Sequence, residues 1–115
     1  MNLTLEIQFP FSACFDEAGG GLAAHNYSLR LLTEPLARAD EKRLRTAVDD
    51  GLIRRIASRD LGRDVDFLKG KPLTESVVLS EFHKRIEPLI APSPVLRLSL
   101  ERADGTRLTL VPDAR

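Results

Sequence analysis

The stretch Ala23-Ala24-His25-Asn26-Tyr27-Ser28-Leu29, read together with Phe11-Ser12-Ala13-Cys14-Phe15, decides the fold. The upstream stretch ends one predicted strand, and the downstream stretch opens the next. The loop between them, Asp16 to Leu22, contains three consecutive glycines, which permit positive φ angles. Pairing of the two strands would bring position 15 close to positions 23 and 25, so we expect a functional site there.

Alternating side chains mark the strands on both sides of this loop. Residues Asn2 to Phe11 alternate between polar and apolar, which is typical of a half-buried strand. Pro10 has no N–H to donate to a ladder and predicts a sheet edge or a bulge. In the second strand the apolar residues that face one side are Tyr27, Leu29 and Leu31.

Two segments in the middle of the chain have helical periodicity. Arg38 to about Leu61 carries an apolar stripe, and a second helix begins near Thr74, a favourable N-cap. The polar segment Asp60 to Pro72 connects them. The stripe of the first helix consists of Leu44, Val48, Leu52, Ile53 and Ile56, and the buried face of the second of Val78, Leu79, Phe82, Ile86, Leu89 and Ile90.

The C-terminal segment from Val95 to Leu110 predicts a β-hairpin. Asp104-Gly105 predicts a type I′ turn, and Leu108 and Leu110 are expected to continue the apolar face of Leu96, Leu98 and Leu100. The order strand, strand, helix, helix, strand, strand predicts an α+β domain over residues 1–115. Two helices would cover one face of a four-stranded antiparallel sheet (ββααββ) in two layers.

Composition excludes several classes of function. The 17 basic and 17 acidic side chains cancel, so no overall positive field favours nucleic acid or an anionic membrane. No apolar run approaches the ~20 residues that span a bilayer, and Met1 to Phe11 does not have the pattern of a signal peptide. The single cysteine, Cys14, offers no internal disulfide. We therefore expect a cytoplasmic protein.

The two stretches around the glycine loop resemble signatures of the 6-pyruvoyltetrahydropterin synthase / 6-carboxytetrahydropterin synthase family. Phe11 to Phe15 is similar to Phe-Ser-Ala-x-His, and Ala23 to Tyr27 is similar to His-Gly-His-Asn-Tyr. In that family the three histidines hold a catalytic zinc. His25 matches the last of them, whereas Phe15 and Ala23 stand in the places of the other two.

The C-terminal third resembles the family at its ligand-binding positions. Pro72 to Glu75 resembles the Pro-Thr-Ser-Glu that opens the second helix, which implies a ligand-binding role for Thr74. Leu98 to Glu101 resembles the strand whose glutamate anchors the pterin ring. A carboxylate can accept two parallel hydrogen bonds from a guanine-like edge, so the resemblance implies ligand binding at Glu101. The alternative for Glu101 is a solvated glutamate at the end of a strand.

The resemblance fails at the catalytic positions. The place of the family's proton-relay cysteine falls on Gly19, and that of its Asp-His pair falls on Ala57 and Ser58. A catalytic zinc takes three protein ligands and a water, so we expect neither catalytic residues nor a cofactor. Zinc remains an alternative if Cys14, Asp16, Glu17 or His83 supplies substitute ligands. Otherwise Cys14 is expected to be a small buried apolar residue of the core and His83 a half-exposed histidine on the second helix.

The resemblance also implies an assembly and leaves three functions open. In the tunnelling fold of this family, edge strands pair between subunits into a barrel, which implies a trimer-based homo-oligomer or a hexamer. The first function is a protein without lyase activity that binds a pterin or purine-like ring. The second is an active pterin-converting lyase with a rearranged site, and the third is a structural or partner-binding module.

Overall fold

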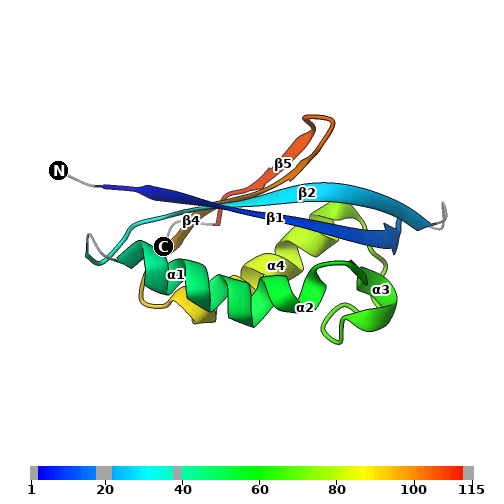
Figure 1. Cartoon of the computed structure of the whole chain (residues 1–115), viewed down its shortest axis with the longest axis horizontal. Helices are drawn as coiled ribbons and strands as arrows, with labels where there is room; N and C mark the ends of the chain where they lie inside the picture. Colours follow the sequence, from blue (N-terminus) through cyan, green and yellow to red (C-terminus); the bar gives the residue numbers. More distant parts are fainter. Residues whose placement is uncertain (1–2, 18–21, 38–39, 113–115) are drawn as a thin grey trace.

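The computed structural model describes residues 3–17, 22–37 and 40–112. A sheet forms one layer and the helices form the other, all of them on one face of the sheet (Figure 1). This arrangement confirms the expected α+β fold. The strands are β1 (Leu5–Asp16), β2 (Leu22–Thr33), β3 (Arg59–Asp60), β4 (Val95–Arg102) and β5 (Arg107–Leu110).

The sheet has five strands in the order β3-β1-β2-β4-β5, one more than predicted. The additional strand, β3, is two residues long and pairs in parallel with β1 at Ala13 and Cys14. The four long strands are antiparallel, as expected. β1 includes the whole of the upstream stretch from Phe11 to Phe15, as expected, and extends one residue into the predicted loop, to Asp16. Pro10 lies where β1 has no described neighbour on the side away from β2, as its missing N–H predicts.

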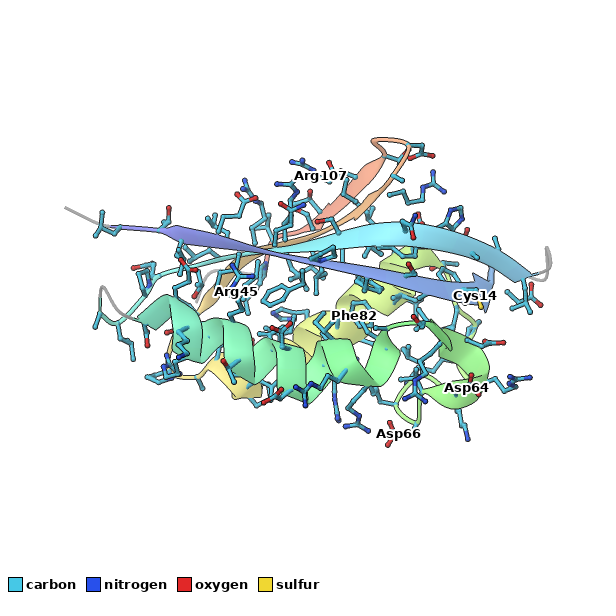
Figure 2. All side chains as sticks on the ribbon, viewed as in Figure 1. Cys14, Arg45, Asp64, Asp66, Phe82 and Arg107 are labelled. Atoms are coloured by element: carbon cyan, nitrogen blue, oxygen red, sulfur yellow. The ribbon has the colours of Figure 1, made fainter. Side chains whose placement is uncertain are left out.

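Aromatic side chains join the sheet to the second helix, α4 (Glu75–Ile90). The ring of Phe11 stacks on that of Tyr27 at 5.4 Å and meets the ring of Phe82 edge-on at 6.1 Å between ring centres. Figure 2 places Phe82 in the layer between sheet and helices, and Arg107 on the opposite side of the sheet. Every predicted apolar position of α4 is buried except Leu89, which is partly buried. Thr74 is the N-cap, as predicted: its hydroxyl accepts from the backbone N–H of Val77.

The first helix differs from the prediction in its extent and its geometry. The predicted start at Arg38 lies outside the described residues. From Glu41 the chain is helical through α1 (Glu41–Val48), the π-helical segment η3 (Asp49–Ile53) and α2 (Arg54–Ile56). The predicted end near Leu61 is wrong, because Ser58 has φ = 60° and the next two residues form β3. A short helix, α3 (Leu61–Asp64), follows, capped by the Asp60 carboxylate.

The C-terminal hairpin is confirmed, but its turn is not type I′. Gly105 has φ = 92°, whereas Asp104 is not among the described residues with positive φ, and type I′ needs both. The N–H of Gly105 donates to Arg102 O, and the N–H of Arg102 donates to Thr106 O. These contacts define a three-residue loop with glycine in the left-handed position.

The apolar face of the hairpin is also less regular than predicted. The β2–β4 pairing shifts register between Leu32 and Thr33, so Val95 is buried and Leu96 only partly. Leu108, opposite Leu100, is 36% exposed because β5 reaches past the helical layer. Within the described residues, no helix is long and apolar enough to cross a membrane.

Candidate functional site

The three positions that the resemblance assigns to zinc ligands lie together on the helix side of the sheet. Phe15 pairs directly with Ala23 across β1 and β2. His25, two residues further along β2, pairs with Ala13. Directly paired residues, and residues two apart on one strand, point to the same face. The predicted proximity of position 15 to positions 23 and 25 is therefore confirmed.

The side chains at these positions do not fit a zinc ion. Zinc takes sulfur, imidazole or carboxylate ligands, and Phe15 and Ala23 carry none of these. Phe15 is only 3% exposed and is part of the apolar core. Over residues 3–17, 22–37 and 40–112, no three His, Cys, Asp or Glu side chains are grouped so that they could hold a metal ion.

His25 instead takes part in a cluster around Tyr27. Its ring meets the Tyr27 ring edge-on at 5.7 Å. The Tyr27 hydroxyl donates to Glu75 Oε2 at 3.1 Å, and Arg102 Nε lies 3.8 Å from the same oxygen. Burial, with the adjacent Glu75 charge and hydrogen bond, raises the pKa of Tyr27 well above its ordinary value of 10.0. The phenol therefore remains protonated and acts as a donor.

Glu101 lies on the opposite face of the sheet from this cluster. It is paired with Ser28 across β2, and its carboxylate binds Arg107 at 2.8 Å and Arg30 at 3.1 Å. Hydrogen bonds from these two arginines lower the pKa of Glu101, so the group is anionic at neutral pH. It borders a depression of about 310 Å³ at the end of the hairpin. The depression is also lined by Asn26, Tyr27, Ser28, Arg102, Ala103 and Gly105.

Thr74 lies on the helix side, so the sheet separates it from Glu101. Its hydroxyl caps α4 and also lies 3.0 Å from the Ser76 hydroxyl. Thr74 borders a second depression, of about 640 Å³, together with Asp16, Arg63 and Lys71. The two predicted ligand-binding residues therefore border different depressions.

A third and larger depression, of about 700 Å³, is bordered by one of the three zinc-ligand positions, His25. It is lined by His25, by Cys14 and by Ser58, one of the two residues aligned with the family's Asp-His pair. Ala57, the other, is packed against the core. Cys14 is half-buried and borders open space, so it is less enclosed than the expected small core residue.

The remaining candidates have structural contacts. Glu17 Oε2 accepts from the N–H of Glu75 and so caps α4. His83 is half-buried, with Nε2 3.5 Å from the Glu87 carboxylate one turn along the helix. The place assigned to the proton-relay cysteine, Gly19, lies outside the described residues.

Sequence reasoning missed the partners of Glu101 and the contacts of Tyr27. Arg30 alternates with buried Leu29 and Leu31, which signals that it faces the polar side of the sheet. Its partner, however, is 71 residues away in the sequence. The Tyr27–Glu75 contact likewise links β2 to a helix 48 residues later, and no local pattern indicates such a contact.

Comparison with known proteins identifies the fold. No protein-family model and no curated protein sequence matches the chain. Among solved structures, 6-pyruvoyl tetrahydropterin synthase from Caenorhabditis elegans superposes with a TM-score of 0.82. The match covers 98% of this chain and 97% of that protein, at 18% sequence identity. The chain therefore has the tunnelling fold of 6-pyruvoyl tetrahydropterin synthase.

Proposed function

We propose that the chain is a 6-pyruvoyl tetrahydropterin synthase-like protein that has lost zinc-dependent catalysis. In this proposal it binds a pterin or purine-like ring through Glu101 and assembles as a homo-oligomer. The observation that carries the loss of catalysis is the burial of Phe15 in the place of the first zinc ligand. A phenyl ring packed in the core supplies no donor and fills space near His25, so the three positions together offer one imidazole.

The state of Glu101 supports binding of a guanine-like edge. Such an edge presents two parallel N–H donors, which an ionised carboxylate can accept. Arg30 and Arg107 keep the carboxylate ionised and hold its orientation. Oε2 of Glu101 accepts from both Nε and Nη2 of Arg107, whereas Oε1 accepts from Arg30 alone. Each carboxylate oxygen has two lone pairs, so one acceptor position remains at Oε1, and a second ligand N–H at Oε2 would replace one of the Arg107 contacts.

Ser28 supports the same position. Its hydroxyl is buried and has no hydrogen-bond partner among the described residues. Ser28 is paired with Glu101 on the neighbouring strand β4, so the two side chains share one face of the sheet. Buried hydroxyls are normally hydrogen-bonded, and an unsatisfied one is destabilising. A ligand or a neighbouring subunit at this depression would satisfy it.

Two open sheet edges support the assembly. From Leu5 to Ser12, β1 has no described strand on the side away from β2, and β5 has none on the side away from β4. Exposed apolar side chains lie next to both edges: Leu3 before β1, and Leu108 and Val111 at β5. Unpaired edges of this kind are normally covered or paired, and a ring of copies, three or six in number, would pair them.

Ligand binding is tested by thermal unfolding with pterin, guanine and adenine. Pterin and guanine carry the two adjacent N–H donors, whereas adenine does not. A ligand at one hundred times its Kd adds about 2.7 kcal/mol to the stability of the wild type. In Glu101→Gln we expect most of this gain to disappear. Glu6→Gln is the matched control, because Glu6 also pairs with Arg30 on this face but lies outside the depression.

Several outcomes would contradict the proposal. Equal stabilisation by adenine, or an unchanged response in Glu101→Gln, would refute the role of Glu101. Zinc-dependent turnover of a dihydroneopterin derivative would refute the loss of catalysis. Sedimentation equilibrium should give a multiple of 12.8 kDa, and a monomer at micromolar concentration would refute the assembly.

A further inference from the structure

The depression of about 700 Å³ is bordered by Arg59. Arg59 forms no hydrogen bond or ion pair with any side chain of the described residues. The neighbouring arginines differ in this respect, because Arg54 pairs with Asp50 at 3.4 Å and Arg55 with Asp66 at 2.7 Å. Arg63, which borders the same depression, pairs with Asp64 at 3.2 Å.

The acidic groups of this depression are already engaged. The Asp60 carboxylate accepts from the backbone N–H groups of Gly62 and Arg63, and so caps α3. Asp64 accepts from Arg63 and from the N–H of Asp60. The pKa of Asp64 is lowered mainly by the hydrogen bond from Arg63, and the charge of Arg59 adds a smaller effect. Arg59 therefore lies near Asp64, but among the described residues no side chain accepts a hydrogen bond from its guanidinium.

Ser58, the residue before Arg59, has an unusual backbone. It is the one described residue other than glycine with a positive φ, 60°. Glycine adopts this conformation without strain, whereas serine does not. The turn is held by the Ser58 N–H, which donates to Ser12 O at 2.6 Å. The Ser58 hydroxyl is exposed, borders the depression and has no hydrogen bond with the described residues.

We propose that Arg59 and Ser58 form a binding site for an anionic oxygen group, a carboxylate or a phosphate. A guanidinium and a hydroxyl are complementary donors for such a group, and arginine suits planar, bidentate recognition of it. Pairing of β3 with β1 fixes the backbone of Arg59 against Ala13. Residues with a strained backbone cluster at functional sites, and a role for the hydroxyl explains why serine rather than glycine occupies the turn before β3.

The test is a titration of the protein's melting temperature with inorganic phosphate and, separately, with acetate. Sodium chloride holds the ionic strength constant. We expect at least one anion to raise the melting temperature of the wild type, and Arg59→Gln to weaken its apparent Kd roughly tenfold or more, the loss expected for a charged hydrogen-bonding partner. Arg54→Gln is the matched control, since Arg54 is exposed and paired. Comparison of the two anions identifies the class.

Two serine variants separate binding from folding. Ser58→Gly removes the hydroxyl and relieves the backbone, so the anion-free protein should be at least as stable while its anion affinity falls. Ser58→Ala removes the hydroxyl and retains the strain, and its affinity should fall as well. Unchanged affinity in Arg59→Gln, an equal loss in Arg54→Gln, or no stabilisation of the wild type by either anion overturns the proposal. Glu101→Gln should retain wild-type anion affinity, so this inference fails or stands independently of ring binding.

Discussion

Introducing histidines at positions 15 and 23, beside His25, should create a metal-binding site. Phe15 and Ala23 are directly paired across β1 and β2, and His25 lies two residues from Ala23 on the same face. Directly opposite Cβ atoms are about 4.5–5.5 Å apart and diagonal ones about 7–8 Å or less. Histidine side chains at such positions can converge on one ion at zinc–nitrogen distances of about 2.0–2.1 Å. The variant Phe15→His, Ala23→His should therefore bind zinc through three histidines.

The structure sets the expected magnitudes. Removing a buried phenyl ring altogether costs about 3–5 kcal/mol, and imidazole replaces part of its volume, so we expect a loss of roughly 2–4 kcal/mol without metal. Ala23 is exposed, and its substitution should change stability by about 0.5 kcal/mol at most. With a Kd near 1 µM, 100 µM zinc adds about 2.7 kcal/mol. For a chain of this length that gain corresponds to roughly 11 °C in melting temperature.

The assay is thermal unfolding with and without zinc at one protein concentration. The wild type, with a single imidazole of about millimolar affinity, should gain only ~0.1 kcal/mol. A triple variant that also carries His25→Ala should lose most of the zinc response. Folding of each variant is checked by circular dichroism. If a folded double variant shows no zinc-dependent stabilisation, or if the wild type gains as much, then the three positions do not form the frame of a metal site.

Three further outcomes follow from individual contacts. The absorbance titration of Tyr27, the only tyrosine, should show no phenolate at pH 10.0 in the folded protein, whereas the urea-unfolded chain titrates near 10. Because the pKa of Tyr27 is higher in the folded protein, its contribution to stability should be constant below pH 10 and should be lost as the pH rises further. A folded-state pKa near 10 would contradict the buried Tyr27–Glu75 contact. The Arg107 and Arg30 contacts lower the pKa of Glu101 from 4.5, so Glu101 should stabilise the fold above that pH and lose this contribution as the pH falls below it. In acid, the melting temperature of Glu101→Gln should therefore fall less steeply with pH than that of the wild type. Parallel plots of melting temperature against pH would count against the arginine contacts. In a helix, Gly→Ala normally adds about 1 kcal/mol to the free energy of unfolding. In urea denaturation Gly51→Ala should not show this gain, because the new Cβ would lie 2.5 Å from Leu89 Cδ2. The gain should appear in a Leu89→Ala background, and equal effects of Gly51→Ala in both backgrounds would show that this contact is unimportant.

Periodicity located most elements because each repeat reflects burial against one surface. The alternation around Tyr27, Leu29 and Leu31 and the helical stripe through Leu44, Val48 and Leu52 correspond to buried faces in the structure. The Thr74 N-cap was equally readable, since its signal is local. Their order along the chain was then enough to indicate two layers.

Departures from the prediction occur where a distant strand sets the local backbone. Ser58 ends the first helix because the residues after it pair with β1 about 46 positions earlier in the chain. Leu96 lies at an irregularity that arises from pairing with β2, so it leaves the face that alternation assigns to it. Asp104 lacks the positive φ that its dipeptide suggests, because Gly105 alone takes the left-handed position in the loop.

The candidate site divides in the same way. The sequence by itself determined the order of strands and helices, the approach of positions 15, 23 and 25, and the absence of donors at two of them, since these depend on residue identity and on a hairpin that is local in the chain. Only the tertiary structure decided that Glu101 and Thr74 lie on opposite faces of the sheet. It also showed that Glu101 is held by Arg30 and Arg107, and that Arg59 makes no hydrogen bond or ion pair with the described side chains. The physical reason is that ion pairs and burial depend on which distant segments come together. The two-residue and 3.6-residue periods show which residues share a face of one strand or helix, but they do not show which distant segment packs against that face.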